Sequence, residues 1–211
     1  KLRKRMTDSD TTLTASKFPN VGYLNVETPE WVRDLIKDAI DSPGDDWRMN
    51  LAGHTQGAHQ LPTLIDNFEY ETWLLDLAME YDDVFPFYRN TICHHQGAIP
   101  LRLHDVWINH HHKHDFNPMH WHEGVYSYVT WIRVPYTQEE ESKHFKTTEP
   151  LAGQFAFTVT DSLGEIHDHI VPQVEWTTLF FPSRMRHKVH PYYSTDEVRI
   201  SLSGNLLLMN K

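Results

Sequence analysis

The second half of this 211-residue chain is a succession of short, strand-like segments. From about Leu101 onward, runs rich in Val, Ile, Tyr, Phe, Trp and Thr alternate with turn residues, a pattern typical of β-strands. The strands are expected at residues 101–109, 118–122, 126–134, 154–160, 165–171, 176–181, 189–193 and 199–207. About eight strands without intervening helices favour a jelly roll or barrel over a parallel sheet with crossover helices.

The first part of the chain has helical patterns instead. Thr28, Pro29 and Glu30 predict a helix start, with Thr28 as the N-cap and proline at the first helical position. A second helix is predicted at about residues 63–81, with an apolar stripe of Phe68, Leu74, Leu77, Ala78 and Tyr81. We expect one domain over residues 1–211, with a helical part at about 28–82, a β core at about 101–208 and an irregular insertion at 139–149.

The composition argues against several classes of partner. Asp and Glu number 29 against 19 Lys and Arg, and the resulting net charge of −10 disfavours binding to a phosphate backbone. No apolar run approaches the roughly 20 residues that span a bilayer. Cys93 is the single cysteine, which favours a reducing compartment, and residues 1–10 lack the apolar stretch of a secretory signal. We therefore expect a cytoplasmic protein without nucleic-acid or membrane partners.

Histidine is abundant, with 16 residues, and one segment arranges it for metal binding. In the segment Phe-Asn-Pro-Met-His-Trp-His-Glu-Gly, which ends at Gly124, His120 and His122 are two residues apart. On a strand, residues at this spacing point to the same face, so both imidazoles can reach one ion while Trp121 faces away. Glu123 follows at a turn that Gly124 permits, and it could swing towards the same ion.

A second histidine motif lies 65 residues further along the chain. Phe180, Phe181 and Pro182 end a predicted strand and lead to His187, the expected third ligand. His190 is the alternative ligand in this segment.

Arg199 and Ser201 share one face of the last predicted strand, which is otherwise apolar. A guanidinium that faces inward matches a carboxylate through two parallel hydrogen bonds, and a hydroxyl two residues along can add a third. The alternative is a simple ion pair of Arg199 with Asp196 or Glu197.

Together these motifs resemble the 2-oxoglutarate and Fe(II)-dependent oxygenase superfamily, in particular its prolyl-hydroxylase-like branch common in marine phages and bacteria. The resemblance covers about residues 101–208 and rests on the motif Asn-Pro-x-His-x-His-x-Gly at 117–124, on His187, and on Arg199-x-Ser201. It implies a mainly β fold, the double-stranded β-helix (jelly roll), with flanking N-terminal α-helices. It also implies Fe(II) bound by His120, His122 and His187.

The same resemblance implies a function. Arg199 and Ser201 would hold the distal carboxylate of 2-oxoglutarate, the co-substrate, which is oxidatively decarboxylated with O2 while a substrate is oxidised. The expected reaction is hydroxylation of a prolyl or other protein side chain, in a bacterial or phage-infected host cell. The identity of the substrate, a protein or a small molecule, is not readable from the sequence.

One departure from the family pattern leaves alternatives open. The usual iron-binding triad contains two histidines and one carboxylate, yet His-x-Asp and His-x-Glu occur nowhere in the sequence. The site is then a three-histidine site, which we prefer, or a site completed by Glu123, or a two-histidine site with water in place of the acid and His122-x-Gly124 as the relevant pair. A cupin-like three-histidine dioxygenase and a catalytically inactive jelly-roll binding or structural protein are the rival functions.

Overall fold

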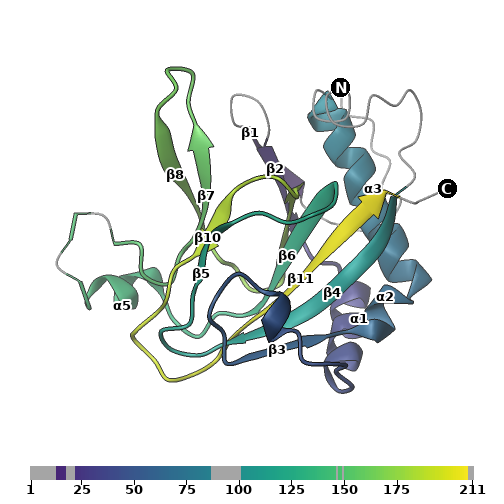
Figure 1. Cartoon of the computed structure of the whole chain (residues 1–211), viewed down its shortest axis with the longest axis horizontal. Helices are drawn as coiled ribbons and strands as arrows, with labels where there is room; N and C mark the ends of the chain where they lie inside the picture. The colour runs from purple at the N-terminus through teal and green to yellow at the C-terminus, as the bar shows by residue number, and fades with distance from the viewer. Residues whose placement is uncertain (1–12, 18–21, 87–100, 146, 149, 209–211) are drawn as a thin grey trace.

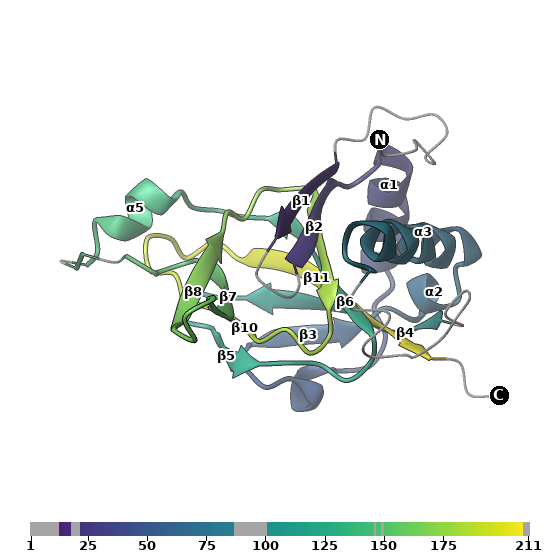
Figure 2. The ribbon, with the colours of Figure 1, turned by 90° about the horizontal axis from the view of Figure 1, so that it is seen from above.

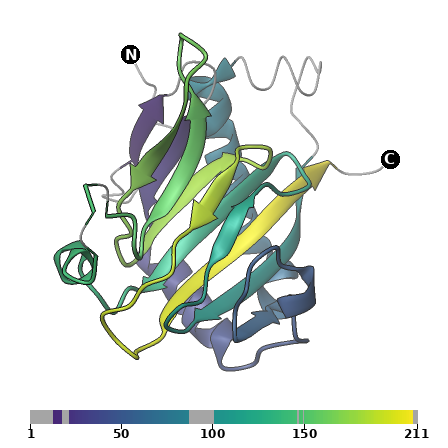
Figure 3. The same ribbon diagram turned by 60° about the vertical axis from the view of Figure 1, so that its left-hand side comes forward.

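The computed structural model describes residues 13–17, 22–86, 101–145, 147–148 and 150–208, so Cys93 lies outside the described residues. Its strands form two antiparallel sheets that face each other, as Figures 1 and 3 show. The larger sheet has the order β1 (Leu13–Lys17), β2 (Gly22–Glu27), β9 (Thr177–Pro182), β6 (Tyr126–Arg133), β11 (Arg199–Leu208), β4 (Leu101–His111) and β3 (Gly57–Gln60). The smaller sheet has the order β5 (Asn117–His120), β10 (His187–Val189), β7 (Phe155–Thr160) and β8 (Ile166–Val171). This is the predicted double-stranded β-helix.

Helices cover the outer face of the larger sheet, which is clearest in Figure 2. They are α1 (Glu30–Ile40), α2 (Pro62–Ile65) and α3 (Phe68–Val84), and a short 3-10 turn lies at Arg48–Asn50. Within the part of the chain that the structure describes, no helix is long and apolar enough to cross a membrane.

The helix boundaries differ from the prediction in two places. The segment predicted as one helix at residues 63–81 is two helices, because the side chain of Asn67 accepts a hydrogen bond from the backbone N–H of Tyr70 at 2.9 Å and caps a new start. Phe68, expected in the buried stripe, is 79% exposed as the first residue of α3. Thr28 does not cap α1: its hydroxyl is buried and lies 2.9 Å from that of Thr178, and Pro29 occupies the N-cap position.

The strand prediction was accurate for most of the second half and incomplete elsewhere. A strand was expected at 189–193, but the observed strand β10 spans His187–Val189. The chain leaves the sheet after Val189. The expected irregular insertion contains the short helix α5 (Gln138–Ser142), whose capping box joins Thr137 and Glu140. Strands β1, β2 and β3 were not predicted, and they extend the larger sheet at both edges.

The strands of the larger sheet direct one row of side chains towards the helices and the other row into the space between the two sheets. On β11, Leu202 and Leu206 point towards the helices and join the apolar cluster that contains Leu77 of α3. Ser201, Ser203 and Asn205 alternate with these leucines, point into the space between the two sheets and line a cavity there. The apolar row therefore anchors the sheet to its helices, and the opposite row is available for a binding site.

We expect the packing of α3 on the sheet to stabilise the domain strongly. Leu77 is fully buried, so Leu77→Ala should lower the free energy of unfolding by about 2–5 kcal/mol, through lost burial and the remaining cavity. Met79 lies on the same helix and is 48% exposed, so Met79→Ala should change it by less than about 1 kcal/mol. Urea denaturation followed by circular dichroism measures both. Equal losses for the two variants would contradict this packing.

Candidate metal centre

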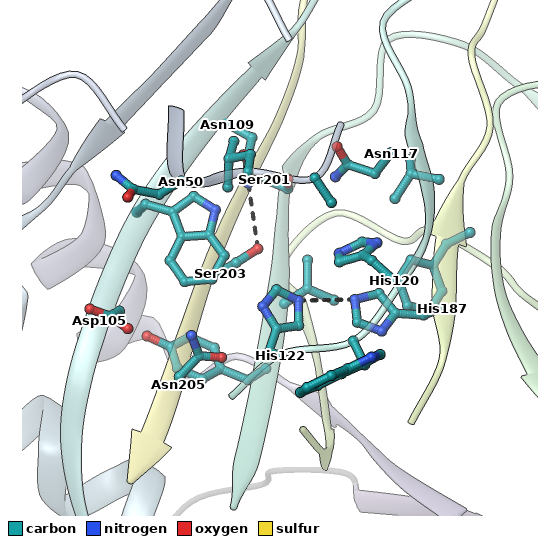
Figure 4. Close-up of a pocket in the computed structure, with 18 of the residues that line it drawn as sticks. Asn50, Asp105, Asn109, Asn117, His120, His122, His187, Ser201, Ser203 and Asn205 are labelled. Atoms are coloured by element: carbon teal, nitrogen blue, oxygen red, sulfur yellow. Dashed lines mark hydrogen bonds between the residues drawn. The ribbon is translucent and has the colours of Figure 1, made fainter. Parts of the chain in front are cut away.

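Three imidazoles converge between the sheets, as Figure 4 shows. His120 ends β5, His122 follows two residues later, and His187 begins β10, where it is paired directly with His120. One ring nitrogen from each lies within 4.8 Å of those of the other two. Among the described residues, these three histidines are the one group of three or more His, Cys, Asp or Glu side chains that could hold a metal ion. The structure thus brings together the three histidines that the sequence singled out.

Backbone carbonyls fix the orientation of two of these rings. Nδ1 of His120 lies 2.7 Å from the carbonyl oxygen of Pro118, and Nδ1 of His187 lies 2.9 Å from that of Met185. A carbonyl only accepts, so each Nδ1 carries the proton and each Nε2 keeps its lone pair. Metal-binding histidines in proteins usually have this support on the second nitrogen. Nε2 of His122 lies 3.1 Å from Nε2 of His187, within the reach of one bound ion.

Burial keeps the three rings neutral. It lowers the pKa of His122 to about 3, with a smaller contribution from neighbouring His120. Burial likewise lowers the pKa of His120, and it lowers that of His187 well below its usual range, helped by the two other rings. A neutral imidazole has the free lone pair that a metal ion requires. The group is therefore ready to bind a divalent cation near neutral pH without first losing protons.

The other candidate ligands lie outside this group. Glu123 lines the cavity but is exposed and is not one of the three converging residues. His190 is also not part of it. Trp121 does not simply turn away, because its partly exposed ring also lines the cavity and has the guanidinium carbon of Arg184 3.9 Å from its centroid.

Arg199 is fully buried and only partly satisfied. Its Nη1 donates to the hydroxyl of Tyr136 at 2.7 Å and, over longer distances, to the carbonyls of Gly153 and His190. Its Nε and Nη2 have no hydrogen-bond partner. Because an unpartnered buried charged donor is costly, this arrangement points to an anion that the protein binds at this position.

The ion pair considered as the alternative for Arg199 does not form. Glu197 pairs with Arg133, and Asp196 pairs with Lys113 at 3.3 Å. Among the described residues no carboxylate forms an ion pair with Arg199. Its second donor group therefore remains free for a ligand.

Arg199 and Ser201 belong to a polar row on the inner faces of β11 and β4. The cross-strand pairs of this row are Arg199 with His111, Ser201 with Asn109, Ser203 with Trp107, and Asn205 with Asp105. All of these residues except Arg199 line a cavity of about 450 Å³, within the roughly 300–1,000 Å³ usual for ligand pockets. The three histidines line the same cavity from the opposite sheet.

Sequence reasoning missed part of this site. Tyr136 contacts Arg199 although 63 residues separate them, and its own O–H donates to the carbonyl of Gly153 at 2.6 Å. Asn109 and Asp105 line the cavity from a strand that the sequence predicted without assigning it a role. The only available signal was their position on alternate residues of that strand, which cannot distinguish a cavity wall from a solvent-facing surface.

One protein-family model matches part of the chain. Residues 105–205 match the family model described as "Putative 2OG-Fe(II) oxygenase", a range that contains all five predicted site residues. The resemblance expected from the motifs is thereby confirmed over the β core. A search of curated protein sequences finds no match to this chain.

A solved structure supports the fold. An oxidoreductase of the 2OG-Fe(II) oxygenase family from Burkholderia pseudomallei is 14% identical, with 86% of this chain and 83% of that chain covered and a TM-score of 0.51. A prolyl-4-hydroxylase from Pseudomonas putida is also 14% identical, with 95% and 93% covered and a TM-score of 0.49. At 14% identity, the likeness to the Burkholderia pseudomallei structure concerns the fold alone.

We expect His187 rather than His190 to be required for metal binding. His187→Ala removes a converging nitrogen and should weaken Mn(II) or Ni(II) binding by more than the roughly 10–100-fold that loss of a mere supporting residue causes. His190→Ala is the matched control, because it removes an imidazole three residues away and leaves the group of three intact. Calorimetric titration of each variant provides the measurement. A larger effect of His190→Ala would contradict the three-histidine site.

Proposed function

We propose that this chain, whose residues 105–205 match the 2OG-Fe(II) oxygenase family, is a 2-oxoglutarate-dependent Fe(II) oxygenase that hydroxylates a prolyl or other protein side chain. The observation that supports it most directly is the state of Arg199, which is buried with two unpartnered donors. Arg199 belongs to the inner row whose other members line the cavity, and the three histidines line the same cavity. A metal site alone fits many functions, whereas a metal site beside a free buried guanidinium fits a carboxylate-bearing co-substrate.

The donor set suits Fe(II). Three neutral imidazoles on one wall of the cavity can bind a divalent first-row metal, for which imidazole is a common ligand. Bound iron would supply the site at which O2 is reduced while 2-oxoglutarate is decarboxylated to succinate and CO2 and one oxygen atom enters a substrate C–H bond. His120, His122 and His187 would hold this ion, without the carboxylate of the usual triad.

The remaining residues position the co-substrate. Arg199 would direct its Nε and Nη2 to the distal carboxylate, and the hydroxyl of Ser201, two residues along the same strand face, would be an additional donor. Tyr136 holds Nη1 at 2.7 Å and so restricts the guanidinium to one orientation. Such preorganised donors fix a small ligand without reorganisation during the reaction.

The substrate assignment rests on the resemblance and on the charge of the chain. A cavity of about 450 Å³ accommodates one side chain or a small molecule. The net charge of −10 disfavours nucleic acid, so we propose a protein or small-molecule partner and no nucleic-acid or membrane partner.

The co-substrate assignment is tested by titrating 2-oxoglutarate into the anaerobic, Mn(II)-loaded protein. Arg199→Ala removes charge-assisted hydrogen bonds of about 1.5–3 kcal/mol each, so the affinity should fall about ten- to a hundredfold or more. Arg199→Lys should restore only part of it, because an ammonium cannot form two parallel hydrogen bonds. Metal binding should persist in both variants.

Arg133→Ala is the matched control, because Arg133 is a half-exposed arginine on the neighbouring strand β6 and pairs with Glu197. It should leave the affinity for 2-oxoglutarate unchanged. Equal affinity of wild type and Arg199→Ala, or no binding at millimolar concentration, would refute the assignment. Retained metal binding would then favour the cupin-like dioxygenase, which also uses three histidines but needs no keto acid, or the binding protein.

A further inference from the structure

The inner row of β4 and β11 has opposite charges at its two ends. Arg199 is paired with His111 at one end, and Asp105 is paired with Asn205 at the other. The two ends lie six residue steps apart along β11, which is roughly 20 Å at about 3.4 Å per residue. A keto acid bound at Arg199 is too short to reach Asp105, so the acidic end of the cavity stays available to a different ligand.

A β-bulge turns Asp105 towards the cavity. Asn205 pairs with Asp105 and the next residue, Leu206, pairs with Leu103, so His104 is an extra residue on β4. Bulges redirect side chains and are common next to active sites. The side chain of Asp105 is 20% exposed and lines the cavity, while His104 is 48% exposed with its Nδ1 2.9 Å from the carboxylate. Only one of the carboxylate oxygens has this contact.

The neighbouring polar groups of the row also present an acceptor. The amide nitrogen of Asn109 lies 3.5 Å from the hydroxyl oxygens of Ser201 and Ser203. Its Oδ1 has no hydrogen-bond partner although the residue is only 3% exposed. Figure 4 shows Asn109 and Asp105 on the same strand, across the cavity from the histidines. A buried free acceptor and a carboxylate together favour a ligand that donates hydrogen bonds.

Aromatic rings form the wall between these acceptors. Trp107 lies between Asp105 and Asn109 on β4, with its ring centroid 6.4 Å from that of Trp47 and 5.7 Å from that of His122. Aromatic faces attract cations, most strongly when water is excluded. Among the described residues that line the cavity, none is a lysine or arginine that could neutralise Asp105.

We propose that the substrate of this site carries a protonated nitrogen, an ammonium or guanidinium, that binds between Asp105 and Trp107. The ring of His122 next to Trp107 brings the metal group beside this position, so a carbon adjacent to the bound cation would face the site of oxidation. The inference rests on the proposed function and narrows its substrate class from any protein side chain to a cationic group, belonging to a peptide or to a free amine.

The test uses matched pairs of ligands that differ in charge. The Mn(II)-loaded, anaerobic protein saturated with 2-oxoglutarate is titrated by NMR with a blocked lysine peptide and its Nε-acetylated form, and with an arginine peptide and its citrulline form. Free lysine and free arginine distinguish a small-molecule source from a peptide, and a blocked proline peptide is the neutral reference. At least one cation should bind tenfold or more tightly than its neutral partner, equivalent to about 1.4 kcal/mol.

Variants test whether the carboxylate of Asp105 causes the preference for the cationic ligand. Asp105→Asn should abolish the preference for the cation while leaving 2-oxoglutarate affinity unchanged, and Asp105→Glu should keep part of the preference. Asp41→Asn removes the same charge from an exposed position after α1 and should change neither. His104→Gln should keep the preference, because the proposed partner of Asp105 is the ligand and not this imidazole. Thermal denaturation checks that each variant is folded.

Equal binding of charged and neutral partners, tighter binding of the proline peptide, or an unchanged preference in Asp105→Asn would overturn this inference. Failure of the proposed function gives a different result, namely no binding of 2-oxoglutarate in the wild type. The cation titrations are then repeated on the protein with Mn(II) alone. A preference for the charged ligand over its neutral form that is lost in Asp105→Asn would still support the inference, and its absence would overturn it.

Discussion

The site depends on the alternation of side chains along β11, the strand between β6 and β4 in the larger sheet. Because successive residues of a strand point to opposite faces, this strand packs Leu202 and Leu206 against the helices and directs Ser201 and Arg199 inward. A shift of one residue in its pairing would bury serine and arginine against the helices and expose leucine to the cavity. The apolar row thus fixes the register, and the register places Arg199 and Ser201 in the inner row.

Burial has different consequences for the imidazoles that line the cavity and for Arg199, which belongs to the same inner row but does not line the cavity. It holds the imidazoles of His122 and His187 neutral by lowering their pKa, which suits them to a metal ion. Arg199 is fully buried, and its Nε and Nη2 have no hydrogen-bond partner. The group of three histidines thus contains no acidic residue, and the two free donors of Arg199 belong to the same inner row as Ser201.

The proposed metal site has three histidines and no carboxylate, so its ligands carry a different total charge from those of the usual triad. A histidine in place of the acid leaves a bound divalent ion with its full positive charge, since all three ligands are neutral. Glu123, the acid that follows His122 in the sequence, lies exposed at the cavity wall. The pairing of His187 with His120 across β10 and β5 brings His187 into the same group.

The sequence by itself determined the β core, the helices before it and the five candidate residues. Periodicity and turn residues are local signals, and His120 with His122, like Arg199 with Ser201, share a face at a spacing of two residues. Only the tertiary structure decided which distant groups meet. The contact of Tyr136 with Arg199 and the addition of β3 to the edge of β4 depend on pairings between segments far apart in the chain. No local pattern encodes such pairings, because the packing of the whole domain selects them.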